Sequence, residues 1–503
     1  MTLVVETDEG VAALPGVGLQ RGGLAAGHVG LQPAQEDNSG AAAGAPSIGY
    51  GGGPPLYAMY RRPRHACLPH MTLTHTPGTV TASTDTGNPA PAPDGASSDG
   101  AADGTTIAGW FGGGRPVVLQ VIPNLVTGGA ERGCIDMAAA LMRAGGTALV
   151  ASGGGPMARE LERYKAEHIT LPLASKNPFT IWRNASRLEA LIRERGVDII
   201  HARSRAPAWS AWIAARCTGI PFVTTFHAPY NFKGEMKRRY NAVMGRGDRV
   251  IAVSRFVAEH VASQYGVGPE RLRTIPRGVD TVNLDPERVS QERLIKLARD
   301  WRLPEDQRIV LLPGRLTRWK GQLDLIEAIA RLKRDDVRAV LVGSDQGRTE
   351  YRAELVARIR ELGLEGQVTI ADHCNDMAAA YLLSDVVVSA SARPEAFGRV
   401  IVEAQAMGKP VIVTNHGAVA ETVVDGETGL VVPPGDPTTM AAAIAEALAL
   451  DSLQRRALAA DARRFVLQNY TRERMCDATL AVYAELLHLR ATVGMAAYRK
   501  AGQ

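Results

Sequence analysis

The chain has 503 residues, of which 45% are hydrophobic, and its formal net charge is +5. At roughly 100–200 residues per domain this length predicts two or three domains, and the mildly basic charge suits phosphates or an anionic membrane surface; we do not expect nucleic acid as a partner. The five cysteines form no CxxC pair, which argues against a disulfide framework and a structural zinc site and favours a reducing compartment.

Residues 1–115 differ in composition from the rest of the chain. Tracts such as SGAAAGAPSIGYGGGPP are rich in Gly, Ala, Pro and Ser, and no lysine occurs in this part. Such a composition buries too little apolar surface to offset the entropy of ordering, so we expect a disordered low-complexity extension. It is either a regulatory tail or the result of a start codon assigned too early, with Met71 as one later candidate.

No membrane-directing segment stands out in the sequence. The first residues lack the basic region and apolar stretch of a signal peptide, and no run of 18 apolar residues occurs. We therefore expect a cytoplasmic protein, with peripheral contact to the inner face of the membrane as a further option.

Apolar strands and helices alternate from Arg115 onward. Such nearly continuous apolar strands between helices predict parallel sheets that are covered on both faces. The polar stretch 280–303 interrupts the pattern and divides it into two α/β halves. Strands are predicted within residues 116–126, 196–204, 221–229, 248–255, 308–316, 337–345, 367–373, 385–391 and 409–415, and helices within 130–146 and 206–219.

The turn NLVTGGAERG (124–133) follows the first predicted strand and opens a helix. Gly128 and Gly129 allow a close backbone approach, and a helix N-terminus attracts an anion. The stretch is not GxGxxG, so the dinucleotide fingerprint is absent. A tight turn without a ligand explains this stretch alone equally well.

The stretch PGRLTRWKGQ (313–322) is the counterpart in the second half. Arg315 and Lys320 follow a strand end, where parallel sheets bind their ligands. Cations are unfavourable at a helix start unless an anion is present, so phosphate binding is favoured over a solvated basic turn.

His227 ends the predicted strand in TTFHAPYN (224–231). A lone histidine there is usually structural, but the same sheet edge carries Gly128 and Gly129, which makes it a candidate for the cleft. The other histidines are scattered and HExxH is absent, so no metal site is predicted.

The stretch 232–246 is basic and helical, with four clustered cations. Its simplest interpretation is a solvated face, and the alternative is contact with anionic lipid or with a phosphorylated acceptor. The cations are Lys233, Lys237, Arg238 and Arg239.

Two carboxylates, Glu395 and Glu403, stand eight positions apart in RPEAFGRVIVEAQAMG. In one helix they would lie about 12 Å apart along the axis and about 80° around it. That exceeds the separation of about 5 to 9.5 Å between the carboxyl groups of a hydrolase pair. Pro394 and Gly398 place Glu395 in a loop and Glu403 in the second turn of a helix. We interpret them as hydrogen-bond acceptors for hydroxyls at two depths along one extended ligand. The alternative interpretation is a loop acid and a helix acid that are both solvated.

Residues from about 116 to 490 resemble the retaining glycosyltransferases of family 4 with the GT-B fold. The resemblance implies two doubly wound Rossmann-like domains that face a cleft. These would be an acceptor-side domain, 116–285, and a nucleotide-sugar domain, 286–469, with a helix at 470–490 that returns to the first domain. The matching stretches are NLVTGGAERG, TTFHAPY, VIAVSRFV, IPRGVDT, LLPGRLTRWKGQLDLIEAIARL, LVGSD and SARPEAFGRVIVEAQAMGKPVIVTNHGAVAETVVDGETGLVVPPGD.

The resemblance also implies roles for single residues. Arg315 and Lys320 would bind the nucleotide diphosphate, Glu395 the hydroxyls of the donor sugar and Glu403 the ribose. His227 would lie near the reacting carbon. Gly128 and Gly129 would lie near the phosphates, and the backbone of Phe397, Gly398 and Arg399 near the donor. Glu421 matches a further family position, and His416 departs from the glycine that many members carry.

The activity implied is transfer of a sugar from a nucleotide-diphosphate donor to a saccharide or lipid-linked acceptor, such as a lipopolysaccharide core. The leaving diphosphate would take the acceptor proton, so we expect retention of configuration, no cofactor and no essential metal. A nucleotide-sugar epimerase of similar fold and a non-catalytic nucleotide-sugar-binding protein are the alternatives.

Overall fold

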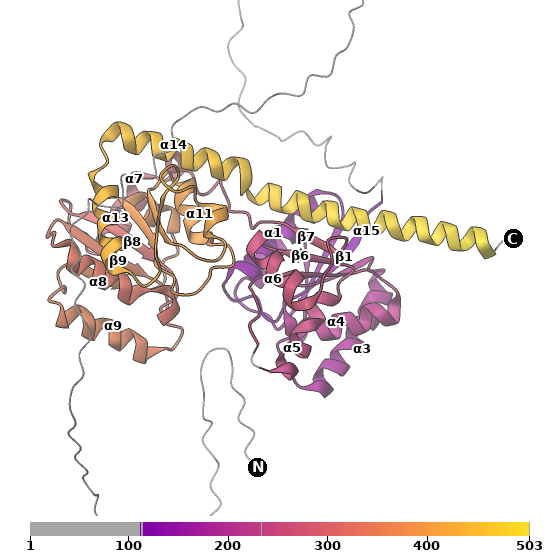
Figure 1. The fold of residues 1–503 in the computed structure, drawn as a ribbon. Coiled ribbons are helices and arrows are strands. Elements are labelled where there is room, and N and C mark those ends of the chain that lie inside the picture. The colour runs from indigo at the N-terminus through magenta and orange to yellow at the C-terminus, as the bar shows by residue number, and fades with distance from the viewer. Residues whose placement is uncertain (1–110, 112–113, 233, 502–503) are drawn as a thin grey trace, which may run out of the picture. The chain divides into compact units, whose positions relative to one another are not determined.

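The computed structural model describes residues 111, 114–232 and 234–501. The predicted disordered extension lies almost entirely outside these residues, as does Lys233. The described part forms two parallel sheets, of seven and six strands, each covered by helices (Figure 1). Each predicted strand segment contains one observed strand, and both predicted helices are present.

The first half builds its sheet in the order β3-β2-β1-β4-β5-β6-β7. Its strands are β1 (Val117–Val121), β2 (Thr147–Ser152), β3 (Glu167–Thr170), β4 (Ile199–Ala202), β5 (Phe222–Phe226), β6 (Arg249–Ala252) and β7 (Leu272–Thr274). Its helices are α1 (Gly129–Arg143), α2 (Ala158–Arg163), α3 (Pro178–Arg195), α4 (Arg205–Thr218), α5 (Glu235–Asn241), the 3-10 helix η2 (Ala242–Arg246) and α6 (Arg255–Tyr265).

The second half repeats the architecture with the strand order β10-β9-β8-β11-β12-β13. Its strands are β8 (Arg308–Pro313), β9 (Val337–Val342), β10 (Val368–Ala371), β11 (Val386–Ser389), β12 (Val411–Thr414) and β13 (Leu430–Val432). Its helical segments are η3 (Pro286–Arg288), α7 (Gln291–Asp300), η4 (Arg318–Lys320), α8 (Gln322–Leu332), α9 (Thr349–Glu361), α10 (Met377–Leu383), α11 (Arg399–Ala406), α12 (Val419–Thr422), α13 (Pro437–Ala449) and α14 (Ser452–Asn469).

Strand β1 shows why both faces of the first sheet are covered. Successive side chains of a strand point to opposite faces. Leu119 and Val121 pack into a core with α3, α4 and α6, whereas Val118 packs into a second core with α1. Both faces of the first sheet are therefore shielded from solvent, as the unbroken apolar strands predict.

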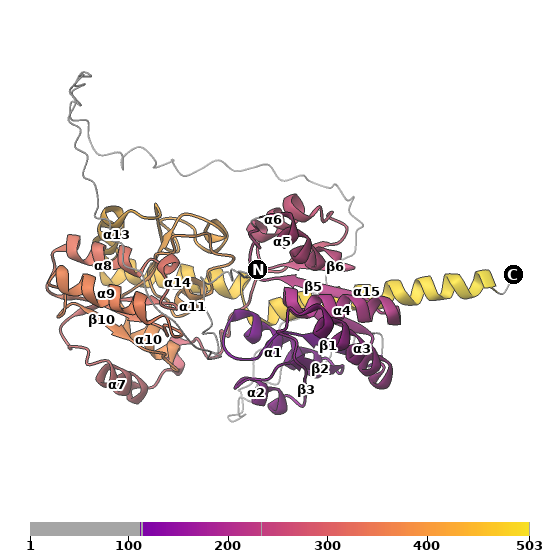
Figure 2. The ribbon, with the colours of Figure 1, turned by 90° about the horizontal axis from the view of Figure 1, so that it is seen from below.

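The last helix, α15 (Arg472–Ala501), leaves the second half and packs on the first. Figures 1 and 2 show it as the yellow helix that continues from α14 and runs past α1. Its Cys476, Leu480 and Tyr483 are buried in the same core as Val118 of β1. The C-terminal helix therefore packs on the first half of the chain.

The chain crosses between the halves twice, and the two crossings are hydrogen-bonded to each other. The amide of Val279 donates to Tyr470 O and the amide of Arg472 donates to Val279 O, each at 2.9 Å. A Cβ on Gly278 would lie 2.4 Å from Thr471 O, so only glycine permits this approach. The two connections therefore form one narrow joint between the halves.

Candidate active site

The predicted site residues follow strand ends in both halves. Gly128 and Gly129 stand at the start of α1, after β1, and His227 follows β5. Arg315 and Lys320 follow β8, and the segment from Glu395 to Glu403 follows β11. Because ligands of open parallel sheets bind beyond the carboxyl ends of the strands, both sheets present their candidate residues where binding is expected.

The two glycines open α1 beneath charged side chains. Gly128 has φ 154°, and a Cβ there would lie 2.5 Å from Glu131 Oε2. A Cβ on Gly129 would lie 1.8 Å from Arg277 Nη1. Burial raises the pKa of Glu131, and Arg277 and Arg315 act in the opposite direction. The start of α1 thus carries a carboxylate close to two arginines.

Lys320 and Glu395 are brought together in the second half. Lys320 Nζ donates to Glu395 Oε1, and both side chains are 14% exposed. Ser391 Oγ donates to the same oxygen at 2.5 Å. The predicted phosphate-binding cation and sugar-binding carboxylate therefore form one half-buried unit, in which a phosphate would compete with Glu395 for Lys320.

The backbone of Glu395 is fixed by the loop that follows β12. Ala418 N donates to Glu395 O at 2.9 Å, and a Cβ on Gly417 would lie 2.4 Å from that oxygen. His416 Nε2 lies 2.6 Å from Ser391 O, to which it can donate. His416, which departs from the usual family residue, therefore supports the segment that carries Glu395.

Arg315 lies on the exposed side of the loop after β8. Its Nη1 lies 3.5 Å from Gln346 Oε1, and its carbonyl accepts a hydrogen bond from Gln322 Nε2 at 2.9 Å. The backbone of Arg315 is held while its guanidinium faces solvent, close enough to Glu131 to oppose the rise in the pKa of that carboxyl that burial causes. This leaves the guanidinium accessible to a ligand.

Glu403 sits on α11, as predicted, but away from Glu395. Its carboxylate accepts from Tyr381 Oη at 2.8 Å and from Arg399 Nε at 2.9 Å. Gly398 caps the start of α11 with φ 82°, which explains why the helix begins after it. The Phe397 ring is 3% exposed and packs edge-on against Tyr470, so this residue can offer a ligand only its backbone.

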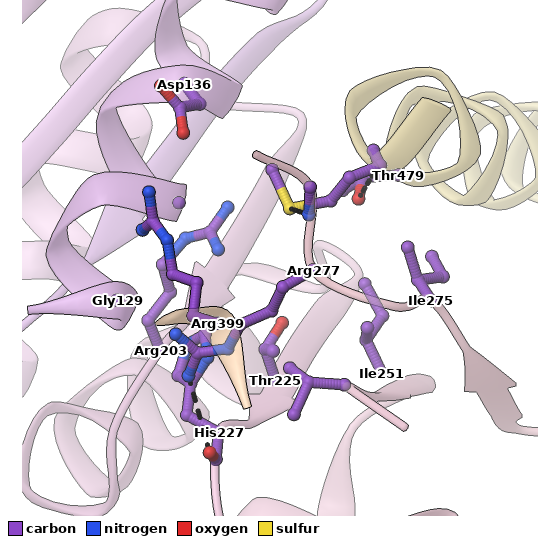
Figure 3. A pocket seen from close by; sticks show the side chains of 14 residues that line it. Gly129, Asp136, Arg203, Thr225, His227, Ile251, Ile275, Arg277, Arg399 and Thr479 are labelled. Carbon is purple, nitrogen blue, oxygen red and sulfur yellow. Dashed lines mark hydrogen bonds between the residues drawn. The ribbon is translucent and has the colours of Figure 1, made fainter. Parts of the chain in front are cut away.

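His227 lines a pocket to which both halves contribute. Neither of its ring nitrogens has a hydrogen-bond partner in the described part of the chain. Burial, with Arg277 and Arg203 nearby, lowers its pKa well below the usual value, so the ring is neutral at pH 7. Figure 3 shows the ring in this pocket, with Arg277 reaching its carbonyl oxygen and Arg399 entering from the second half.

Three charged residues of the pocket were not foreseen from the sequence. Arg203 follows β4, Arg277 follows β7, and Asp136 lies on the inner face of α1. Burial raises the pKa of Asp136 to about 6. The rule that drew attention to His227, a polar residue at a strand end, would also have selected Arg203.

Glu421 bridges the two halves. Its carboxylate accepts from the amides of Arg255 and Phe256 at the start of α6, each at 2.8 Å. A negative charge at a helix N-terminus is favourable, and free amides there need acceptors. Glu421, to which the sequence assigned no role, therefore caps a helix of the opposite half.

Comparison with known proteins identifies the family. The profile "Glycosyl transferases group 1" matches residues 295–465, and "Glycosyltransferase Family 4" matches residues 127–283. A D-inositol 3-phosphate glycosyltransferase of Xylanimonas cellulosilytica is 30% identical over 315 residues, which is 59% of this chain and 74% of that protein. The chain belongs to the group 1, family 4 glycosyltransferases.

Solved structures agree with this assignment. A glycosyltransferase from Rickettsia africae matches this glycosyltransferase with TM-score 0.70 and 37% identity, over 74% of this chain and 99% of that one. The Anabaena protein HepE, solved with UDP-glucose, matches with TM-score 0.65 and 26% identity, over 73% of this chain and 99% of that one. The predicted GT-B fold and the predicted enzyme class are confirmed.

Two further features bear on the site's surroundings. Within the described ranges, no helix combines the length and the apolar character needed to cross a membrane. In the same part of the chain, no group of three or more His, Cys, Asp or Glu side chains is placed to hold a metal ion together.

Proposed function

We propose that this glycosyltransferase moves a sugar from a nucleotide-diphosphate donor to a hydroxyl of a saccharide or lipid-linked acceptor, with retention of configuration and without a metal. The observation that supports this most is the Lys320–Glu395 unit after β8 and β11, with Arg315 beside it. HepE, a structural relative, was solved with UDP-glucose, which supports a UDP-sugar as the first donor to test.

In the proposed reaction, Arg315 and Lys320 stabilise the negative charge that develops on the leaving diphosphate. Donors that are fixed before the reaction stabilise such charge at little cost in reorganisation. When the diphosphate engages Lys320, Glu395 becomes free to accept hydrogen bonds from hydroxyls of the donor sugar. Ser391, which donates to Glu395 at 2.5 Å, would keep that carboxylate oriented.

The bond changes balance without a protein nucleophile. The bond between the anomeric carbon and the phosphate oxygen breaks, and a bond from the acceptor oxygen forms on the same face. The acceptor proton passes to the leaving phosphate oxygen. The chain's part is to position both substrates and to exclude water.

Glu403 is proposed to bind the ribose in addition to its present hydrogen-bond partners. Its carboxylate oxygens are already engaged by Tyr381 and Arg399. A carboxylate oxygen has more than one lone pair, so a ribose hydroxyl can add to these bonds. The rigid position on α11 would then fix the distance between ribose and diphosphate.

We propose a cell-envelope saccharide of the lipopolysaccharide-core type as the acceptor class. An inositol phosphate is a second candidate, because the relative from Xylanimonas cellulosilytica is a D-inositol 3-phosphate glycosyltransferase. Both this relative and the Rickettsia africae protein are glycosyltransferases, which weighs against the epimerase and the non-catalytic binding protein.

The test is a screen of nucleotide sugars for binding and slow hydrolysis, followed by mass analysis of products with both acceptor classes, each with and without a chelator. We expect one UDP-sugar to bind and to give a product whose yield the chelator leaves unchanged. Loss of transfer with chelator, restored by a divalent cation, would contradict the metal-independent mechanism. Binding without turnover on any acceptor would favour the non-catalytic alternative.

We also propose that the first half contacts an anionic membrane surface. In α5, Arg238 and Arg239 pair with Glu235 at 3.3 and 3.2 Å, whereas Met236 is 88% exposed. The predicted basic helix therefore has part of its charge compensated, and it presents an apolar side chain. Apolar and cationic side chains on one face are typical of helices at lipid interfaces.

Helix α3 extends this surface. Phe179 and Trp182 are 67% and 62% exposed, and their ring centroids lie 6.4 Å apart. Helix α4 connects α3 to α5, because Ser210 donates to a carbonyl of α3 and Trp209 to a carbonyl of α5, each at 3.0 Å. The exposed Arg183 adds a cation next to the aromatic pair.

Vesicle partitioning tests this proposal. We expect binding to phosphatidylglycerol vesicles in preference to phosphatidylcholine, weakened at least fivefold in Trp182→Ser. Leu453→Ser, which changes a residue on α14 that is 76% exposed, is the matched control and should bind as the wild type does. Equal partitioning of the two variants would count against this surface.

A further inference from the structure

We infer that Arg203 and Arg277 form an anion subsite on the first half, which binds a phosphate or carboxylate carried by the acceptor. This inference rests on the proposed transferase function and specifies its acceptor as a negatively charged molecule. The subsite belongs to the pocket that also contains His227 (Figure 3).

Arg277 is held in the pocket without a full set of partners. Its Nε is shielded from solvent and has no hydrogen-bond partner among the described residues. Its Nη2 reaches only as far as His227 O, at 3.4 Å. Because a buried unpaired donor is costly, such a group is best explained by a ligand that satisfies it.

Arg203 is 6% exposed and is held by neutral groups. Its Nε donates to Gln120 Oε1 at 2.6 Å, and Tyr483 is a further hydrogen-bond partner. These contacts fix the guanidinium without neutralising it. A buried cation that is positioned but not neutralised is suited to an anionic ligand.

The sequence of α1 makes room for both guanidinium groups. Gly129 and Gly133 are four positions apart, so they lie on the same face of the helix. A Cβ on Gly129 would lie 1.8 Å from Arg277 Nη1, and one on Gly133 would lie 3.8 Å from Arg203 Nη1. The two arginines therefore lie one above the other along the first two turns of α1.

The pocket as a whole is positively charged. Arg399 enters it from the second half. Burial, together with the charge of Arg399, lowers the pKa of Arg277 to about 10. The nearby acids compensate only in part. Asp136 and Glu131 supply at most two negative charges, against the three positive charges of Arg203, Arg277 and Arg399. An anion would relieve this repulsion.

The location favours the acceptor over the donor as the source of the anion. Arg315 and Lys320 of the second half are already assigned to the donor diphosphate, whereas Arg203 and Arg277 follow strands of the first half. The free space is about 30 Å³, well below a pocket for a whole ligand of about 300 Å³ or more. It suits one small charged group, with the rest of the acceptor outside.

The test uses Arg277→Gln in the full chain, with Arg277→Lys as the conservative variant and Arg216→Gln, an exposed arginine on α4, as the control. Acceptors are offered as matched pairs: D-inositol 3-phosphate with inositol, and glucose 6-phosphate with glucose. Binding of inorganic phosphate to the UDP-saturated protein is measured in parallel, which needs no knowledge of the acceptor. UDP binding and donor hydrolysis are measured without acceptor.

We expect Arg277→Gln to weaken phosphate binding and to raise KM for a phosphorylated acceptor at least tenfold, with UDP binding and donor hydrolysis changed less than twofold. Arg277→Lys should recover part of the loss, and Arg216→Gln should match the wild type. Equal use of charged and neutral acceptors, or no phosphate binding by the wild type, would overturn the inference. Loss of UDP binding in Arg277→Gln would assign the arginine to the donor. A wild type that binds no nucleotide sugar would instead refute the proposed function.

Discussion

At the scale of single residues, the site pairs groups that a substrate must separate. Lys320 and Glu395 hold each other, while Arg315 faces solvent from the same loop. In the proposed reaction, a diphosphate takes over Lys320 and releases Glu395 for the sugar. Charge on the leaving group is thus coupled to recognition of the sugar.

Removing either cation should therefore reduce transfer. We predict that Arg315→Ala and Lys320→Ala each lower kcat about 10²-fold or more, the effect typical of losing one preorganised donor. Steady-state kinetics would measure this. Arg318→Ala is the control, because Arg318 lies between them in the same loop but pairs with Glu354. Near-normal turnover in both test variants would refute the phosphate assignment.

Asp136 predicts a pH dependence of stability. Its pKa is raised by burial to about 6, from an ordinary value of 3.8. The folded state therefore binds the proton of the Asp136 carboxyl more tightly than the unfolded state does. The stabilisation of the folded state by this proton is fully present below pH 3.8 and is lost as the pH rises through about 6. Asp136→Asn cannot lose a proton and escapes this loss.

The melting temperatures of wild type and Asp136→Asn, compared at pH 4.5 and pH 7, measure this effect. We expect the melting temperature of the variant minus that of the wild type to increase by several degrees from pH 4.5 to pH 7. Groups that titrate in both proteins affect both melting temperatures equally, so they cancel in this difference. A difference that does not change with pH would show that burial does not raise the pKa of Asp136.

At the scale of elements, the sequence predicted the segments well and their long-range contacts poorly. Pro394 and Gly398 correctly placed Glu395 in a loop and Glu403 in the second turn of a helix, because both punctuation residues act locally. The pairing of Lys320 with Glu395 joins residues 75 positions apart. Local propensity carries no information about such a contact.

The same limit explains the residues that were missed. Arg277 contacts Gly129 because β7 and β1 belong to one parallel sheet, so their carboxyl ends lie on the same side of it. The strand order was not predicted, so this meeting could not be foreseen. Strands β2, β3, β7 and β13 also lie outside the predicted segments.

Glu421 supplies a prediction at this scale. Its carboxylate caps α6 of the opposite half through two amides at 2.8 Å. Glu421→Ala should destabilise the chain by about 1 kcal/mol, as expected for a lost helix cap. Thermal unfolding measures the loss, and Glu427→Ala, at an exposed position in the turn that follows α12, serves as the control. Equal melting temperatures for the two variants would argue against the cap.

At the scale of the whole molecule, the candidate site residues follow the strands of two separate sheets, and helix α15 connects the two halves. The two chain crossings at Val279 and Thr471 bond to each other, so the halves share one narrow joint. Closure about such a joint would bring the Lys320–Glu395 unit toward the first half. Movements of this kind exclude water during transfer.

The N-terminal extension is predicted to be dispensable. Deleting residues 1–110 should leave turnover within about twofold of the full chain, because its composition cannot supply a core to the sheets. The measurement is kcat/KM of the shortened protein, with its melting temperature as a check on folding. An unfolded or inactive product would refute this interpretation.

The leaving diphosphate and the fixed cations are proposed to carry the chemistry, on the face of the sugar where the donor bond breaks. The anomeric configuration of the product, read by NMR before any equilibration, tests this central claim most directly. We predict that product and donor share one anomeric configuration. A product of inverted configuration would contradict the claim, because transfer would then proceed on the opposite face.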